Sequence, residues 1–241
     1  HDDTTLQAGF YLASADSWTE MKSALEYFIA PQQNFVSAHI NGNVHFIAPG
    51  RIPIRRNGNG WLPSAGWTGD GDWIGTVPFH ELPHQNVSDS GMIVTANQKI
   101  IDADYPYFIT QDWAMPYRAE RIKALLTDSS NHTTESNKHI QTDVQSNMAK
   151  SFLPLMLSVT PDPEGKEAHN LLSRWDGSMR KGSIEPLLFH TWYRELTRFL
   201  YADELGDKFD GVWTRRPNFV HRTLTGENQW CDDVRTDQIE S

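Results

Sequence analysis

The sequence is poor in cysteine, in long apolar runs and in positive charge. Cys231 is the single cysteine among 241 residues, which excludes an intrachain disulfide and a cysteine-rich zinc site. No apolar stretch approaches the roughly 18 residues that a membrane-spanning helix needs. Lysine and arginine number 21 against 31 acidic residues, a net charge of −10. Because nucleic-acid binding depends on basic phosphate contacts, we predict neither a nucleic-acid nor a membrane partner.

The first part of the chain carries strand and turn signals after one helix. Ser17 and Glu20 have the spacing of a capping box, and apolar residues then recur at helical intervals until Pro31, which predicts a helix of about 13 residues. Asn41-Gly42 joins two flanks rich in β-branched and apolar residues, 34–40 and 43–48. This pattern predicts a hairpin with a type I′ turn, in which both central residues need positive φ.

Glycine and proline then interrupt the chain at close intervals. Residues 51–90 contain Trp61, Trp67 and Trp73 between these breakers, which predicts an ordered loop pinned by buried aromatic side chains. Residues 92–95 form a short apolar run that is typical of a strand.

Helical periodicity begins at Pro116, which suits a first helical turn. The spacing of apolar residues in the second half of the sequence predicts four helices. The first has Ala119, Ile122, Leu125 and Leu126 on one face, and the second has Ile140, Val144, Met148 and Phe152. The third contains Leu171 and Leu172, and the fourth, at 187–200, has Leu188, Trp192, Leu196 and Phe199. Pro154 should kink or end the second, and Gly177 should cap the third. Residues 209–241 are weakly patterned. We predict an α+β fold, with a strand and loop segment at 1–112 and a helical lobe at 113–241.

Two motifs suggest metals. His80-Glu-Leu-Pro-His84 has the letters of the zinc-protease motif H-E-x-x-H, which works only on a helix. Pro83 lies inside it, and a proline in a helix costs roughly 3 kcal/mol, so a loop is the better interpretation and a zinc hydrolase the rival. Asp70-Gly-Asp72 lacks the ligand series of a calcium loop and predicts a turn.

Several segments, taken in order, resemble one enzyme family. They are the hairpin at 34–50, Arg51-Ile-Pro-Ile-Arg55, the run Gly91–Asn97, Asp104-Tyr-Pro106 and the stretch 117–122. Gln141-Thr-Asp143, Trp175-Asp-Gly177 and Trp230-Cys-Asp-Asp233 extend the match over nearly the whole chain. In order and spacing they resemble the catalytic β chain of the penicillin acylase (penicillin amidase) family.

The resemblance implies an N-terminal-nucleophile hydrolase with an αββα sandwich, which cleaves linear amides through an acyl-enzyme. It also implies that the segments 1–112 and 113–241 are both parts of one larger catalytic domain. The family's nucleophile is a serine at the start of its chain, whereas this sequence begins with His1. We therefore expect a fragment that is inert by itself and that partners the remainder of its own precursor, the α chain and the rest of the β chain. The resemblance also implies a bacterial, periplasmic or secreted protein.

The resemblance assigns roles to three residues. Asn97 ends the run Gly91–Asn97 at the position of a family asparagine whose amide binds the oxyanion, while Gln98 replaces a second asparagine. Arg118 matches a functional arginine before a helix that ends in Leu-Leu, with Arg121 as its competitor. Gln33 falls where penicillin-cleaving members place an apolar residue of the acyl pocket, which puts a phenylacetyl preference in doubt.

The expected substrate is a small-molecule amide. β-Lactam side-chain amides and acyl-homoserine lactones are both used in the family, and nothing in the sequence separates them. No cofactor is required for the chemistry; a structural calcium ion is compatible with the resemblance, but its ligands do not map cleanly onto this chain. The rival from another class is a non-catalytic binding module.

Overall fold

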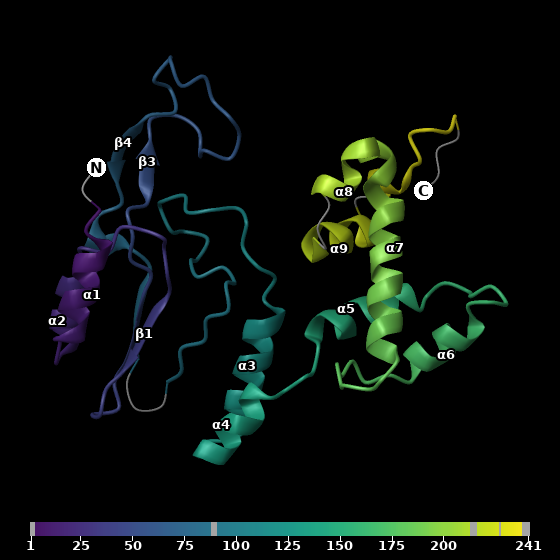
Figure 1. Ribbon diagram of the computed structural model, residues 1–241, viewed down its shortest axis with the longest axis horizontal. Coiled ribbons are helices and arrows are strands. Elements are labelled where there is room, and N and C mark those ends of the chain that lie inside the picture. The colour runs from purple at the N-terminus through teal and green to yellow at the C-terminus, as the bar shows by residue number, and fades with distance from the viewer. Residues whose placement is uncertain (1–2, 88–90, 213–215, 227, 238–241) are drawn as a thin grey trace. The chain divides into compact units, whose positions relative to one another are not determined.

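A computed structural model describes residues 3–87, 91–212, 216–226 and 228–237. The chain divides into two compact units, His1–Ala114 and Met115–Ser241 (Figure 1). Strands occur among the described residues of the first unit only, and helices dominate the second. The predicted α+β class is therefore confirmed.

Two helices open the first unit: α1 (Thr5–Ala13) and α2 (Trp18–Leu25). At the start of α2, the Ser17 hydroxyl accepts the Glu20 amide at 3.2 Å, but the Glu20 carboxylate accepts the amide of Asp16 at 2.7 Å, so only half of a capping box forms. The helix is shorter than predicted, because the amides of Tyr27 and Phe28 turn tightly onto carbonyls three residues back. Helix α1 was not predicted; the Thr4 side chain makes no capping bond, but Asp3 Oδ1 accepts the Thr5 amide at 2.9 Å.

A three-stranded antiparallel sheet has the order β1-β2-β5 and consists of β1 (Phe35–Ala38), β2 (Val44–Ile47) and β5 (His84–Val87). Helix α2 packs on it through the Trp18 ring, which stacks on His45 of β2 with ring centroids 4.4 Å apart. The hairpin between β1 and β2 is confirmed, but its predicted type I′ turn is wrong. Of its two turn residues Asn41 and Gly42, only Gly42 has positive φ, at 86°. Its amide donates to the His39 carbonyl at 2.9 Å, which is the pattern of a longer loop closed by a glycine bulge.

The region 51–90 contains more sheet than predicted. Strands β3 (Pro53–Arg55) and β4 (Trp73–Thr76) form a second, two-stranded antiparallel sheet, followed by the short 3-10 helix η1 (Phe79–Glu81). The prediction of buried tryptophans is wrong: Trp61, Trp67 and Trp73 are 52%, 89% and 56% exposed. Backbone hydrogen bonds hold the loop instead, from the Arg56 amide to Asp72 at 2.9 Å and from the Asn57 amide to Asp70 at 3.0 Å.

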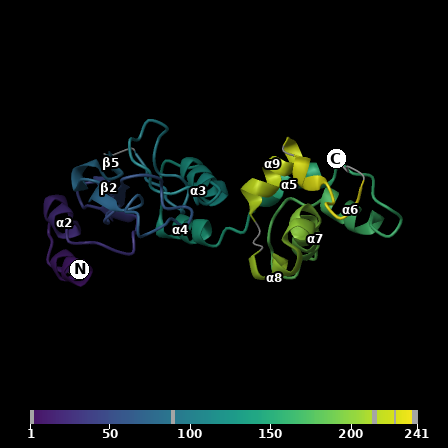
Figure 2. The same cartoon turned by 90° about the horizontal axis from the view of Figure 1, so that it is seen from above.

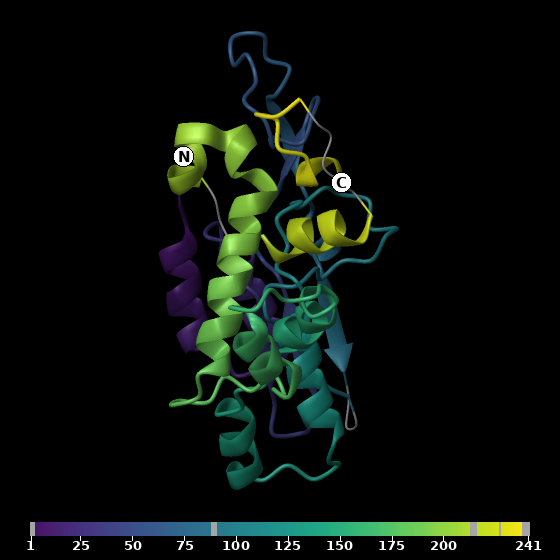
Figure 3. The ribbon, with the colours of Figure 1, turned by 90° about the vertical axis from the view of Figure 1, so that its right-hand side faces the viewer.

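The second unit contains α3 (Tyr117–Thr127), α4 (Thr134–Gln141), α5 (Asn147–Met156), α6 (Lys166–Ser173), α7 (Glu185–Leu205), η2 (Gly206–Lys208), α8 (Phe209–Val212), α9 (Pro217–Thr225) and η3 (Asn228–Cys231). Helices α5 and α9 lie beside α7 in both views (Figures 1 and 2). Figure 3 shows α7 as one continuous helix. The core of the unit combines side chains of α5, α6, α7 and α9, among them Phe152, Leu172, Phe189, Tyr193 and Val220, all 0–1% exposed.

Three helical predictions need correction. The single helix through Ile140 and Phe152 is two helices, α4 and α5, because Gln145 leaves the helical path to form a bridge with Ser178. Helix α7 is longer than 187–200, and its face is displaced by one residue: Phe189 is fully buried, whereas the predicted core residue Phe199 is 80% exposed.

Gly177 is not a helix cap, since α6 ends at Ser173. It has φ 81°, and a Cβ there would lie 2.9 Å from the side-chain nitrogen of Gln145. Glycine therefore permits the close approach of this turn to the segment between α4 and α5. Among the described helices, none combines the length and apolar character that a membrane crossing requires.

Candidate functional site

The segment that carries Asn97 has no strand partner. Residues 91–95 have no assigned secondary structure, so the strand predicted at 92–95 is wrong. The side chain of Gln98 explains the difference: its Oε1 accepts the Ala96 amide at 2.6 Å and its Nε2 donates to the Val94 carbonyl at 2.9 Å. A carboxamide thus occupies two backbone groups that a neighbouring strand would otherwise pair.

Asn97 lies directly after this segment in a left-handed backbone conformation, with φ 67°. Asparagine is among the few residues other than glycine that adopt this region readily. The Asn97 carbonyl accepts the Ala114 amide at 3.0 Å, which ties the turn to the end of the first unit. The residue is exposed, while its neighbour Ala96 is buried. The backbone at Asn97 is therefore held on both sides and the residue lies at the surface of the unit.

A side-chain bond brings the start of β1 to the same segment. Asn34 Nδ2 donates to Thr95 Oγ1, a contact between residues far apart in the sequence. Gln33, the residue before Asn34, is exposed in the loop that leads into β1. Asn34, which follows Gln33, is therefore hydrogen-bonded to Thr95, two positions before Asn97.

The two candidate arginines lie on α3 in the second unit and differ in their surroundings. Arg121 forms a two-pronged ion pair with Asp143, from Nε at 2.9 Å and from Nη2 at 2.6 Å. The Arg121 hydrogen bonds hold the pKa of the Asp143 carboxyl below its usual value, and Asp143 in turn raises the pKa of Arg121. Asp143 also accepts the Gln145 amide at 3.1 Å, so Arg121 fixes α3 to the segment after α4. Arg118, in the first turn of α3, is exposed.

The letters H-E-x-x-H do not form a helical zinc motif. His80 and Glu81 belong to the 3-10 helix η1, and His84 begins β5. The Nδ1 atom of His84 lies 2.8 Å from the Leu82 carbonyl. Within the described residues, no cluster of three or more histidine, cysteine or acidic side chains is arranged to hold a metal.

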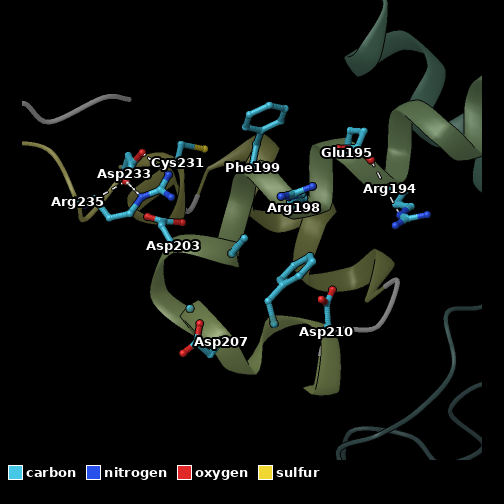
Figure 4. A pocket seen from close by; sticks show the side chains of 13 residues that line it. Arg194, Glu195, Arg198, Phe199, Asp203, Asp207, Asp210, Cys231, Asp233 and Arg235 are labelled. Carbon is cyan, nitrogen blue, oxygen red and sulfur yellow. Dashed lines mark hydrogen bonds and ion pairs between the residues drawn. The ribbon is translucent and has the colours of Figure 1, made fainter.

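Sequence reasoning did not find a hollow of about 1130 Å³ beside the C-terminal half of α7 (Figure 4). Its lining mixes charges, and the exposed Phe199 lies among them. Asp233 and Arg235 on its rim form a two-pronged pair at 2.7 and 2.6 Å, and this pair lowers the pKa of Asp233 to about 2. Nearby, burial and then a side-chain hydrogen bond with Asp203 raise the pKa of Glu204 to about 6. None of the predicted site residues lines this hollow.

Comparison with known proteins decides the family. The model of the penicillin amidase family matches residues 1–241. The chain belongs to the penicillin amidase family. It is similar to the penicillin acylase 2 proenzyme of Pseudomonas sp. (strain SE83), with 31% identity over 70% of this chain and 22% of that protein. It is also similar to the acyl-homoserine lactone acylase QuiP of Pseudomonas fluorescens (strain Pf0-1), with 30% identity over 99% of this chain and 32% of that protein.

The fold agrees with a solved member of the family. A thermostable penicillin G acylase from Alcaligenes faecalis superposes with a TM-score of 0.68 at 21% identity, covering 87% of this chain and 40% of that one. The chain spans 22% to 32% of the length of the two curated relatives named above.

Proposed function

We propose that this chain is part of an acylase that hydrolyses a linear small-molecule amide through an acyl-enzyme, with Asn97 as a donor to the oxyanion. Membership of the penicillin amidase family supports the reaction class. The observation that carries the role of Asn97 is its backbone: a left-handed asparagine, exposed, with its carbonyl bonded to the Ala114 amide.

The chemistry requires a neutral donor at a fixed place. When an N-terminal serine attacks the amide carbonyl, negative charge develops on the carbonyl oxygen, and the acyl-enzyme that follows is hydrolysed by water. A carboxamide N–H held in advance stabilises that charge without having to reorient, and such a donor typically contributes roughly 10²–10³ in rate. The serine and a second, backbone donor are proposed to come from outside this chain.

Arg118 is proposed to act beside the nucleophile. A fixed guanidinium favours the neutral form of a nearby α-amino group, which must be unprotonated to act as the base. The position of Arg118 before Leu125-Leu126 supports the choice of Arg118 over Arg121 for this role.

The proposal is tested by Asn97→Ala in the full-length enzyme. We expect kcat to fall by about 10²–10³ with little change in KM, because the lost interaction is made only in the transition state. Asn131→Ala, which changes an exposed loop asparagine, is the matched control and should leave both constants unchanged. An Asn97→Ala enzyme with parental kcat would overturn the role of Asn97.

Acyl-homoserine lactones are a second candidate substrate class beside β-lactam side-chain amides. The alignment with QuiP spans 99% of this chain, against 70% for the penicillin acylase 2 proenzyme. The polar side chain of Gln33 also argues against a phenylacetyl group in the acyl pocket. The ratio of kcat/KM for an N-acyl homoserine lactone to that for a phenylacetyl amide, measured on one preparation of full-length enzyme, separates the two classes.

The cellular location of the enzyme and the origin of its nucleophile belong to the same proposal. We propose a bacterial periplasmic or secreted enzyme, with structural calcium as an accessory ion whose ligands are completed elsewhere. The rival, a non-catalytic binding module, predicts that the parent gene encodes no serine behind a cleavable segment upstream of His1. Reading that gene distinguishes the two.

A further inference from the structure

Gln98 is the departure from the family pattern that the proposed function does not use. Its carboxamide spans two backbone groups, the Ala96 amide at 2.6 Å and the Val94 carbonyl at 2.9 Å. Val94 and Gln98 are partly buried and Ala96 is buried. The side chain therefore closes a small ring that contains Asn97.

We infer that Gln98 is a positioning residue that fixes the backbone at Asn97 and so aims the Asn97 carboxamide. This inference rests on the proposed function, since it matters only if Asn97 acts in catalysis. The backbone at Asn97 is left-handed, with φ 67°, and bonds on both sides of the residue hold it there. The Gln98 bonds hold the chain before Asn97, and the Ala114 amide holds the Asn97 carbonyl after it.

We call the two hydrogen bonds of the Gln98 side chain, to the Ala96 amide and the Val94 carbonyl, the Gln98 clamp, and its chemistry needs a glutamine. One group must accept from the Ala96 amide and the other must donate to the Val94 carbonyl, and a primary carboxamide offers both. Glutamate keeps the acceptor but has no donor when it is ionised. Methionine has a similar shape and makes neither strong bond. These variants remove the clamp stepwise with little change in volume.

A double-mutant cycle in the full-length enzyme tests the inference. Small errors in the placement of a catalytic group lower rates by up to about 10²-fold, so Gln98→Met should lower kcat by about 10- to 100-fold while KM changes little. Gln98→Glu keeps the acceptor but places a carboxylate oxygen against the Val94 carbonyl, so it should lower kcat as well. In the Asn97→Ala background, Gln98→Met should change kcat by less than about twofold, because residues that act through one another are not additive.

Two readouts separate positioning from general damage. Hydrogen exchange of a peptide that covers residues 91–98 should be faster in Gln98→Met, while the urea midpoint stays near that of Gln85→Met, a matched change on the exposed face of β5. A fall in kcat by the same factor with and without Asn97 would overturn the inference, as would unchanged exchange at 91–98. If Asn97→Ala alone keeps the parental kcat, the proposed role of Asn97 fails instead. The kcat of this single variant decides that question without any change at Gln98.

Discussion

The pair between Arg121 and Asp143 offers the sharpest test of how the two arginines of α3 divide their work. Replacing Arg121 by methionine keeps the length of the side chain but removes both hydrogen bonds to Asp143. We expect Arg121→Met to lower the free energy of unfolding and to leave kcat of the full-length enzyme unchanged. We expect Arg118→Met to lower kcat of the full-length enzyme.

The magnitude follows from the geometry. Hydrogen bonds to charged groups contribute about 1.5–3 kcal/mol when buried, but the side chains of Arg121 and Asp143 are 30% and 20% exposed, so water compensates for part of the loss. We therefore expect a loss of about 1–2 kcal/mol, which lies above the value typical of fully exposed pairs. Urea unfolding followed by tryptophan fluorescence measures it, provided that the slope m stays the same.

The pH dependence supplies an independent check. The hydrogen bonds from Arg121 lower the pKa of Asp143 in the folded protein. A carboxyl whose folded pKa is depressed stabilises the protein above its unfolded pKa, about 3.9 for aspartate, and loses that contribution as the pH falls through the folded value. The stability difference between the parent and Arg121→Met should therefore be constant near neutral pH and shrink below about pH 4.

Two results would refute this reasoning. A loss of kcat in Arg121→Met with unchanged stability would show that the catalytic register lies one helical turn further along α3. A stability difference that persists unchanged at pH 2 would show that the effect does not come from the Asp143 charge.

Three further substitutions test the packing. The Phe152 side chain is 0% exposed and packs edge-on against Tyr193, so Phe152→Ala should lower the free energy of unfolding by about 3–5 kcal/mol. Trp67 is 89% exposed, so Trp67→Ala should change that free energy by less than about 0.5 kcal/mol. Comparable losses in the two variants would contradict the assigned core. Gly177→Ala should lower stability by about 1–3 kcal/mol, because φ is 81° and the new methyl would meet the Gln145 side chain at 2.9 Å; a urea midpoint equal to that of the parent would contradict the close approach.

The sequence predicted correctly those features that depend on residues close together in the chain, such as a helix start and a hairpin loop. Ser17 begins α2 as expected, and Asn41-Gly42 lies in a hairpin loop as expected. The type of turn was not predictable in the same way, because an Asn-Gly pair also fits a longer loop in which only the glycine has positive φ. The second sheet was missed for a similar reason: β3 has 3 residues and β4 has 4, too short to show a period.

Tertiary contacts determined what the local patterns could not. The interval of four through Ile140 and Phe152 predicts one helix, but the backbone at Gln145 pairs with Ser178 from beyond α6, and this long-range bridge ends the periodicity. The exposed tryptophans show the same limit. Aromatic residues among glycines suggest a buried anchor, yet which side of a loop faces the protein depends on neighbours that are far away in the sequence.

For the candidate site, the order of motifs located Asn97, Arg118 and Gln33, and their roles stay predictions. The left-handed backbone at Asn97 and the ion pair of Arg121 required coordinates, because both depend on partners outside the motif: Ala114 for the first and Asp143 for the second. The hollow beside α7 had no sequence signal at all, since its lining comes from two separate stretches, 194–210 and 231–235.

The pair Asn97-Gln98 shows why a departure from a family pattern needs a structure before it is interpreted. By sequence alone, glutamine in place of a second asparagine casts doubt on a second amide donor. In the folded chain both ends of the Gln98 carboxamide are bonded to the backbone, at Ala96 and at Val94. The longer Gln98 side chain instead reaches back across the turn and bonds the backbone before Asn97. If Asn97 is the one side-chain donor at this turn, the second donor that an oxyanion requires must come from a backbone amide, and Gln98→Glu should weaken catalysis through geometry rather than through charge at the reacting carbonyl.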